Sequence, residues 1–291
     1  MNQIKHPSIP TTKIEPGIQM PMLGFGVYQV PDANQCEQAV VDAIQAGYRL
    51  IDTAAAYFNE EAVGSGIARS SVRREDLFIT SKVWVQDAGY AATIKAFKSS
   101  LMKLGLDYLD LYLIHHPLGD YWGSWRAMDE LQRAGLIRAI GVCNFTPARL
   151  ADLAIGSGVT PSINQIEVHP FFQRENELAA MRELGVQPES WGPFAEGKHG
   201  IFTNKTLCEI GKAHKKTAAQ VALRWNLQRG SVVLAKSVKA ERMAENLAVC
   251  DFELSTEEMN AISSLDLGTS SFVGHESIES VRMRHEFKVH E

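Results

Sequence analysis

The sequence has few cysteines, no long apolar run and no excess of positive charge. Its four cysteines are scattered and form no C-x-x-C pair, so free thiols in a reducing compartment are the simplest interpretation. No segment approaches the roughly 18 consecutive apolar residues of a membrane span. The segment Met1–Pro21 has no apolar signal-peptide core. These absences favour a cytoplasmic protein.

The sequence also lacks a basic block and a Rossmann motif, and each absence excludes a class of function. With 29 basic and 34 acidic residues the net charge is -5, and no basic block indicates binding to nucleic acid or to an anionic membrane. No G-x-G-x-x-G motif follows a strand-like segment, so a Rossmann dinucleotide site is not supported. The remaining composition is that of an ordinary globular protein, 45% hydrophobic over 291 residues, which is enough for a large core.

Strand-like and helix-like segments alternate along the chain. Eight strands with helices between them predict a parallel sheet that closes into a (β/α)8 TIM barrel, and a β-hairpin predicted at 13–20 is expected to cover the barrel floor. No linker interrupts the pattern, so residues 1–291 are expected to form a single domain; a doubly wound open sheet is the structural alternative. The predicted strands are 23–27, 50–52, 77–83, 108–115, 137–142, 162–168, 186–191 and 232–235.

Several predicted strands end in a polar residue that faces the same way as the apolar residues before it. Strand side chains alternate with a period of two, so Asp52 shares a face with Leu50. Lys82 and His115 end their own strands in the same way, and Tyr57 follows Asp52 by a short loop. Charged groups on a buried face are costly unless they meet one another or a ligand. They therefore predict a site at the C-terminal mouth of the barrel, where such folds hold active sites.

The chemistry of these residues suits proton donation. A tyrosine ionises near pH 10, and a cation about 4 Å away contributes about 4 kcal/mol at an effective dielectric of ~20. We therefore expect Lys82 to lower the pKa of Tyr57 by about two to three units, with Asp52 orienting Lys82 and His115 bonding a substrate oxygen. Each residue alone also has a structural explanation (a buried ion pair, a packed tyrosine, a core histidine). Their coincidence at three strand ends favours a site.

Two motifs point to other enzymes. Residues 192–199 are one residue from a P-loop, but the final His199 cannot supply the magnesium-binding hydroxyl. The pair His115–His116 suggests a metal site, but adjacent strand residues are expected to face opposite sides, and no H-x-H or H-E-x-x-H motif accompanies them. We therefore predict no bound metal, and neither a nucleoside triphosphatase nor a zinc hydrolase.

Four separated segments also occur in the order and form of a known family. Residues 23–28 (LGFGVY), 48–54 (YRLIDTA), 80–84 (TSKVW) and 110–115 (DLYLIH) resemble motifs of the aldo-keto reductases. The nearest branch is the bacterial one of diketogluconate and methylglyoxal reductases, and the resemblance covers nearly the whole chain. It implies the same barrel and a catalytic tetrad of Asp52, Tyr57, Lys82 and His115, with Tyr57 as the general acid.

The resemblance also implies a site for the cofactor, NADPH or NADP+. Asn144 and Gln165 lie in segments similar to those that hold the nicotinamide carboxamide, and Trp191 stands where the family places a ring against the nicotinamide. Lys236 and Arg242 resemble the adenosine-phosphate site, and their chemistry fits an anion near a helix N-terminus. The expected cofactor residues are Gly26, Val27, Tyr28, Asp52, Asn144, Gln165, Trp191, Lys236, Ser237, Val238, Arg242, Glu245 and Asn246.

The expected function is NADPH-dependent reduction of aldehydes and ketones (small dicarbonyls, keto-sugars or other reactive carbonyls) by a monomer. Substrate contacts are expected from Trp84, His115 and Trp122, with Trp84 and Trp122 as an aromatic wall. The short polar tail at 268–291 favours an open pocket, and the glycine-rich loop at 192–199 is expected to cross the bound cofactor. A scaffold that holds cofactor without turnover is the alternative from another functional class.

Three positions depart from the family's pattern. Cys143 stands where many members have Ser, His116 where many have Trp, and Val238 where some have an aromatic residue. None belongs to the tetrad. The departures therefore concern substrate choice and cofactor affinity rather than the reaction.

Overall fold

Eight parallel strands close into a barrel in a computed structural model that describes residues 9–272, 274 and 277–291. The first eight residues of the N-terminal segment and three positions of the tail at 268–291 lie outside the described residues. The order around the barrel is β10-β3-β4-β5-β6-β7-β8-β9, so the last strand pairs with the first and the predicted (β/α)8 barrel is confirmed. The strands are β3 (Leu23–Gly26), β4 (Leu50–Asp52), β5 (Phe78–Val83), β6 (Leu109–Ile114), β7 (Ile137–Cys143), β8 (Ile163–Glu167), β9 (Gln187–Trp191) and β10 (Val232–Ala235).

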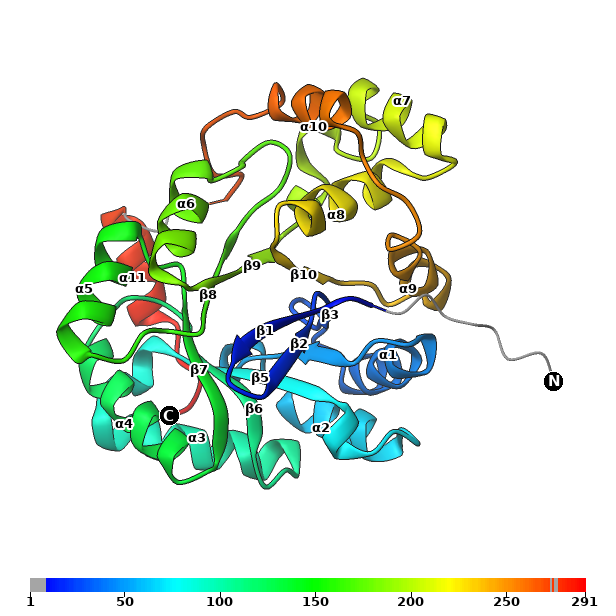
Figure 1. Cartoon of the computed structure of the whole chain (residues 1–291). Coiled ribbons are helices and arrows are strands. Elements are labelled where there is room, and N and C mark those ends of the chain that lie inside the picture. Colours follow the sequence, from blue (N-terminus) through cyan, green and yellow to red (C-terminus); the bar gives the residue numbers. More distant parts are fainter. Residues whose placement is uncertain (1–8, 273, 275–276) are drawn as a thin grey trace.

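Helices surround the barrel (Figure 1). They are α1 (Ala33–Ala46), α2 (Glu60–Arg69), α3 (Tyr90–Leu104), α4 (Tyr121–Arg133), α5 (Pro147–Ser157), α6 (Glu175–Leu184), α7 (Lys205–His214), α8 (Ala218–Gln228), α9 (Ala240–Leu247), α10 (Thr256–Ser263) and α11 (Ile278–Glu286). Neither α10 nor α11 was expected from the alternation of strands and helices. A signal for α10 was present, because Ser255 and Glu258 form a capping box at its N-terminus.

The helix ends follow local chemistry that the sequence contains. The side chain of Asp32 accepts a hydrogen bond from the backbone N–H of Gln35 at 2.8 Å and so begins α1. Gly47 ends the same helix with φ 120, a conformation that other residues rarely adopt. Such caps explain why α1 begins after Asp32 and ends before Gly47.

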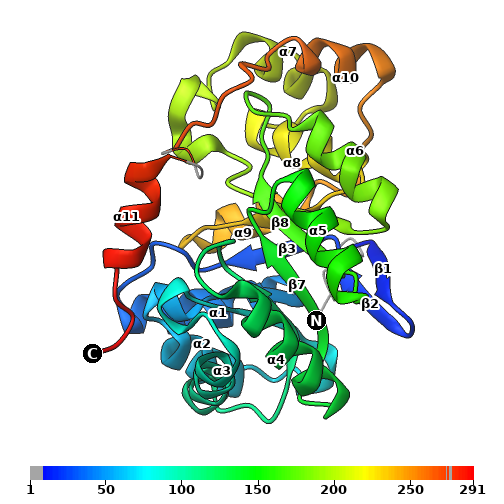
Figure 2. The same cartoon turned by 90° about the vertical axis from the view of Figure 1, so that its left-hand side faces the viewer.

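An N-terminal hairpin closes the barrel floor. Strand β1 (Thr11–Glu15) pairs antiparallel with β2 (Ile18–Pro21), and Gly17 between them has φ 80. Ile18 and Met20 are buried against the interior residues Leu50 and Phe78. The predicted cover of the floor is therefore confirmed. Figure 2 shows the hairpin at one end of the barrel and α11 at the other.

The barrel interior changes from apolar to polar along the strands. Its lower part is filled by inward side chains such as Phe78, Leu111 and Ile163. The next inward positions toward the carboxyl ends include Lys82 and Gln165, both buried. This polar layer lies directly beneath the mouth at which the candidate site is built.

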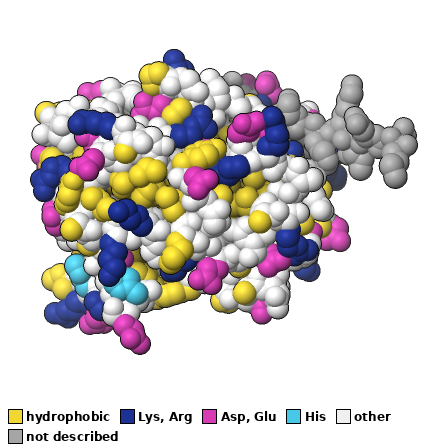
Figure 3. Space-filling view, turned by 90° about the horizontal axis from the view of Figure 1, so that it is seen from below, with side chains coloured by type: hydrophobic (Ala, Val, Ile, Leu, Met, Phe, Trp, Pro, Cys, Tyr) yellow, Lys and Arg dark blue, Asp and Glu magenta, His cyan; other side chains and the backbone are white. Residues whose placement is uncertain are grey.

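The outer surface shows no large patch of a single charge on the face seen in Figure 3, where acidic and basic side chains are interspersed. Within the described part of the chain, no helix combines the length and the apolar character that a membrane crossing requires. These two observations therefore give no reason to place a functional site away from the barrel mouth.

Candidate active site

The carboxyl ends of β4 and β5 bring two charged side chains together. Lys82 is fully buried, and its Nζ donates to Oδ1 of Asp52 at 2.6 Å and to the carbonyl oxygen of Thr53 at 3.0 Å. Strand pairing sets this contact, because Asp52 lies opposite Thr80, the inward neighbour of Lys82 on β5. The pair satisfies a buried cation that would be very costly alone.

The same ammonium group reaches Tyr57. Its nitrogen lies 3.4 Å from Oη of Tyr57 and 5.0 Å from the centre of the ring. Tyr57 ends a 3-10 turn that follows β4, and its ring lies 5.0 Å from the ring of Tyr28 and 5.7 Å from that of His115. The structure therefore brings all four predicted tetrad residues together.

The protonation states follow from burial and from this pairing. Burial raises the pKa of Tyr57 above its usual range, although the Lys82 ammonium lowers it. The expected net lowering is wrong for this structure: Lys82 acts in the predicted direction, but desolvation of the phenolate outweighs it. Burial also acts to lower the pKa of Lys82, but Asp52 and Tyr57 hold that pKa above its ordinary value. Lys82 is thus a cation and Tyr57 a neutral phenol at neutral pH.

The two adjacent histidines lie side by side rather than on opposite faces. The rings of His115 and His116 are stacked, with centres 5.0 Å apart and planes 5° apart. The expectation of opposite faces is wrong because β6 ends at Ile114 and the strand alternation ends with it. Trp84 stands edge-on to both rings, 5.1 Å from His115 and 5.3 Å from His116. Among the described residues there is no group of three or more His, Cys, Asp or Glu placed to hold a metal ion.

The C-terminal tail forms a wall of the site. Nε of Arg284, in α11, donates to Nε2 of His116 at 3.2 Å. Nε1 of Trp84 donates to the carbonyl oxygen of Phe287 at 2.9 Å, and the ring of Phe287 lies 5.4 Å from that of Trp84. We expected the tail to leave the pocket open, but its residues cover the side of the pocket at Trp84 and His116. Sequence reasoning missed both tail residues, and the presence of His116 instead of Trp was the one related signal.

Three residues expected at the nicotinamide lie next to the tetrad. Gln165 donates to Oδ2 of Asp52 at 3.0 Å. Asn144 follows β7 with φ 61, so its side chain leaves the strand alternation; it donates to the carbonyl oxygen of His115 at 3.1 Å. Nε1 of Trp191 donates to Oδ1 of Asn144 at 3.1 Å. The structure thus links all three to Asp52 and His115.

The residues from the first barrel strand also lie at the mouth. Gly26 lies opposite Asp52 in the pairing of β3 with β4. The backbone N–H of Val27 donates to the carbonyl oxygen of Asp52 at 3.2 Å. Tyr28 is exposed, and its ring contacts Tyr57. These positions border the tetrad on the side of β3.

The residues expected at the adenosine phosphate lie between β10 and the first turns of α9. Lys236, Val238 and Arg242 are exposed, whereas Ser237 is buried. Two cations at the N-terminal end of a helix fit an anionic group, because backbone N–H groups there also favour negative charge. The donor set therefore suits a phosphate.

Two other residues of this group are engaged within the protein. The hydroxyl of Thr217, in the cap of α8, donates to Oε1 of Glu245 at 2.6 Å. Asn246 is buried. The contact of Glu245 with Thr217 holds α9 against α8.

Trp122 takes part in the packing between two helices. It is in α4, stacked against Tyr121, and a Cβ added at Gly156 of α5 would come within 2.8 Å of its ring. These are contacts of helix packing. A ring that contacts Trp84 at the mouth is that of Phe287, and the substrate contact expected of Trp122 stays a prediction.

The glycine-rich loop after β9 is not built as a P-loop. Ala195, Glu196 and His199 have left-handed φ values of 47, 50 and 56, so no regular helix follows the glycines. Oε1 of Glu196 accepts from Gln29 at 3.1 Å, and Lys198 donates to the carbonyl oxygen of Ser271 at 2.6 Å. The loop therefore connects the segment after β3 with the tail.

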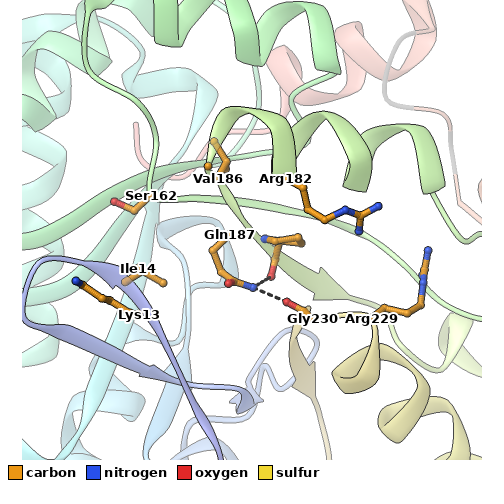
Figure 4. A pocket seen from close by; sticks show the side chains of 10 residues that line it. Lys13, Ile14, Ser162, Arg182, Val186, Gln187, Arg229 and Gly230 are labelled. Carbon is orange, nitrogen blue, oxygen red and sulfur yellow. Dashed lines mark hydrogen bonds between the residues drawn. The ribbon is translucent and has the colours of Figure 1, made fainter.

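A separate hollow of about 220 Å³ lies at the floor. Figure 4 shows Lys13 of the hairpin on one side and Arg182 and Arg229 on the other, with Gln187 between them. Arg229 is engaged with Glu175 at 2.5 Å. No tetrad residue lines this hollow, so it is distinct from the candidate site.

The barrel and the cluster at its mouth define a class of protein. A sequence model of the Aldo/keto reductase family matches residues 22–267, and the chain belongs to that family. The predicted resemblance is thereby confirmed, and with it the class of enzyme.

The chain is also similar to individual proteins whose activity or cofactor is named. The chain is 47% identical over 257 residues to a glyoxal reductase of Bacillus subtilis, covering 88% of this chain and 92% of that protein. It is 45% identical over 259 residues to methylglyoxal reductase DkgA of Escherichia coli, covering 88% and 93%. Among solved structures, a Bombyx mori aldo-keto reductase in complex with NADP matches with a TM-score of 0.87 and 34% identity, covering 92% of this chain and 96% of the other.

Proposed function

We propose that the protein reduces aldehydes and ketones to alcohols with NADPH, and that Tyr57 donates the proton. The observation that carries the proposal is the buried chain of contacts at the barrel mouth, in which Lys82 lies 2.6 Å from Asp52 and 3.4 Å from the Tyr57 hydroxyl. Hydride transfer to the carbonyl carbon is the chemistry that NADPH supplies when bound.

Each tetrad residue has a role that its surroundings support. Tyr57 holds its proton at Oη because burial raises the pKa of the phenol, so the acid form is present at neutral pH. The Lys82 cation stabilises the phenolate that forms as the proton leaves, and Asp52 keeps Lys82 in place. His115, whose ring lies 5.7 Å from that of Tyr57, orients and polarises the substrate oxygen.

The cofactor is held by residues of three regions. Asn144 and Gln165 offer amide groups to the nicotinamide carboxamide, and Trp191 offers a ring. Arg242 offers a planar fork to the adenosine phosphate, and Lys236 adds a second cation. The NADP complex of the Bombyx mori relative supports NADPH as the cofactor. We infer that the loop at 192–199, which connects Gln29 and Ser271 through its side chains, crosses the bound cofactor.

The substrate we propose is a small reactive carbonyl, such as a dicarbonyl. The names of the glyoxal and methylglyoxal reductases at 45–47% identity support this choice. The tail residues Arg284 and Phe287 narrow the side of Trp84 and His116, which favours a small substrate. One chain supplies all four tetrad side chains, so we infer that a monomer is sufficient.

The test is oxidation of NADPH in the presence of methylglyoxal, with Tyr57→Phe as the variant. We expect carbonyl reduction to fall by at least ~100-fold, the scale of general-acid catalysis, while the affinity for NADPH stays unchanged. Tyr90→Phe is the matched control, because Tyr90 is an exposed tyrosine of α3 and should leave turnover intact. Near-normal turnover of Tyr57→Phe would exclude Tyr57 as the donor.

A second measurement separates an enzyme from a scaffold. The wild-type protein is assayed with a panel of a dicarbonyl, a keto-sugar and a lipid aldehyde. Tight NADPH binding without turnover of any of the three would identify a cofactor-holding scaffold and contradict the proposal. A preference within the panel identifies the substrate class.

A further inference from the structure

One amide inside the barrel is held by two carboxyl groups. Nε2 of Gln165 donates to Oδ2 of Asp52 at 3.0 Å and to Oε2 of Glu189 at 2.9 Å. Strand pairing produces this arrangement, because Gln165 of β8 lies directly opposite Glu189 of β9. Asp52, Gln165 and Glu189 are all buried. The two bonds use both N–H groups of the amide and leave its carbonyl oxygen, Oε1, out of the pair.

This arrangement fixes which way the amide faces. Rotating the amide of Gln165 by half a turn would set its carbonyl oxygen against the Asp52 carboxylate and take both N–H groups away from these acceptors. A buried polar group that loses its partner costs about 1–3 kcal/mol. Asp52 binds one N–H of the Gln165 amide. Glu189 binds the other N–H, so that both hydrogens of the amide are held.

The bond from Gln165 is the hydrogen bond that the Glu189 side chain makes in the described part of the chain. Oε1 of Glu189 is buried and has no hydrogen-bond partner among the described residues. Burial and the nearby Asp52 raise the pKa of Glu189 to about 8, although Gln165 and Lys82 lower it. A protonated carboxyl group still has acceptor capacity, so the bond from Gln165 persists at neutral pH. Burying the carboxyl group of Glu189 in the barrel interior costs free energy. Its role therefore follows from the hydrogen bond that it accepts from Gln165.

We propose that Glu189 is a positioning residue for the nicotinamide end of the cofactor. By binding the second N–H of Gln165 it makes the carbonyl oxygen of that amide the group offered to the cofactor, where it accepts from the carboxamide NH2. The inference rests on the proposed function, because it requires that NADPH bind at the barrel mouth. It adds a residue that touches neither cofactor nor substrate and acts through Gln165.

The test compares two cofactors in binding rather than in turnover. One is NADPH, and the other is its 3-acetylpyridine analogue, in which a methyl group replaces the carboxamide NH2. Dissociation constants are measured by quenching of tryptophan fluorescence. We expect the wild-type protein to bind NADPH about fivefold more tightly than the analogue, the scale of one neutral hydrogen bond.

The variants separate the hydrogen bond that Glu189 accepts from the negative charge that Glu189 can carry. Glu189→Met removes the acceptor and should reduce the ratio of the two constants toward one. Glu189→Gln retains an acceptor oxygen and should keep the wild-type ratio. Ser190→Ala is the control on the same strand, because Ser190 is buried and lies outside this amide contact. Thermal unfolding confirms that each variant is folded, and Glu189→Ala replaces Glu189→Met if that variant is not.

Each outcome decides a separate question. A wild-type ratio retained in the variant without an acceptor overturns the role of Glu189, as does a wild-type ratio of one. Loss of the ratio in Ser190→Ala as well shows a general disturbance of β9 and also overturns it. If the wild-type protein binds neither cofactor, the proposed function itself fails.

Discussion

The ammonium nitrogen of Lys82 lies 2.6 Å from Oδ1 of Asp52, and the exposed fractions of the two side chains are 0% and 4%. The pair joins β4 to β5 at the level where the barrel interior becomes polar. A buried ion pair is expensive to assemble, but breaking it by removing one partner leaves an uncompensated charge. If the proposed mechanism holds, stability and activity depend on the same contact.

The first prediction concerns this pair. Asp52→Asn should lower the free energy of unfolding by about 3–5 kcal/mol, because Lys82 remains buried without its counter-charge. Urea unfolding measures the change. Asp76→Asn is the control, because Asp76 pairs with Arg73 on the surface and the change should be close to zero. Equal losses in the two variants would contradict the energetic role of burial.

The second prediction is a pH dependence of stability from Glu189. Its pKa in the folded protein is about 8, above its ordinary value of 4.5, so the folded state keeps a proton that the unfolded chain releases. This contribution to stability is fully present below about pH 4.5 and is lost as the pH rises toward about 8. Glu189→Gln cannot titrate, so its stability relative to the wild type should increase with pH. Urea unfolding at about pH 5 and about pH 8 should show a difference on the order of a few kcal/mol; parallel stability curves would refute it.

The third prediction concerns the choice of cofactor. Arg242→Ala should weaken NADPH binding about tenfold or more, the scale of a charge-assisted hydrogen bond, and should leave NADH binding nearly unchanged. Fluorescence titration with both cofactors measures this. Arg126→Ala, an exposed arginine of α4, is the control and should affect neither. Equal weakening of the two cofactors by Arg242→Ala would mean that the phosphate assignment is wrong.

The fourth prediction concerns the tail. Arg284→Met removes the donor to His116, whose ring is stacked on that of His115. We expect kcat/KM for methylglyoxal to fall about tenfold, the scale of a lost charge-assisted hydrogen bond, with the affinity for NADPH unchanged. Arg282→Met alters an exposed arginine of the same helix and should leave both quantities intact. A matching loss in the two variants would show that α11 acts only through its stability.

Much of the fold could be predicted because its signals are local. The bounds of α1 follow from a cap at Asp32 and a glycine at position 47, and the inward positions of Asp52 and Lys82 follow from strand alternation. The tail could not be predicted in this way. The role of α11 depends on a contact between Arg284 and His116, which are 168 residues apart in the chain.

The barrel, the polar strand ends and the types of residue at them follow from the amino-acid sequence alone, because alternation and capping act between near neighbours. The protonation of these groups and the contacts they make depend on how the whole chain folds. Lys82 lowers the pKa of Tyr57 as predicted, yet burial reverses the net direction. Glu189 meets Gln165 only because β8 and β9 are paired. Burial and strand pairing are set by distant parts of the chain, so neither can be obtained from the residues around a position.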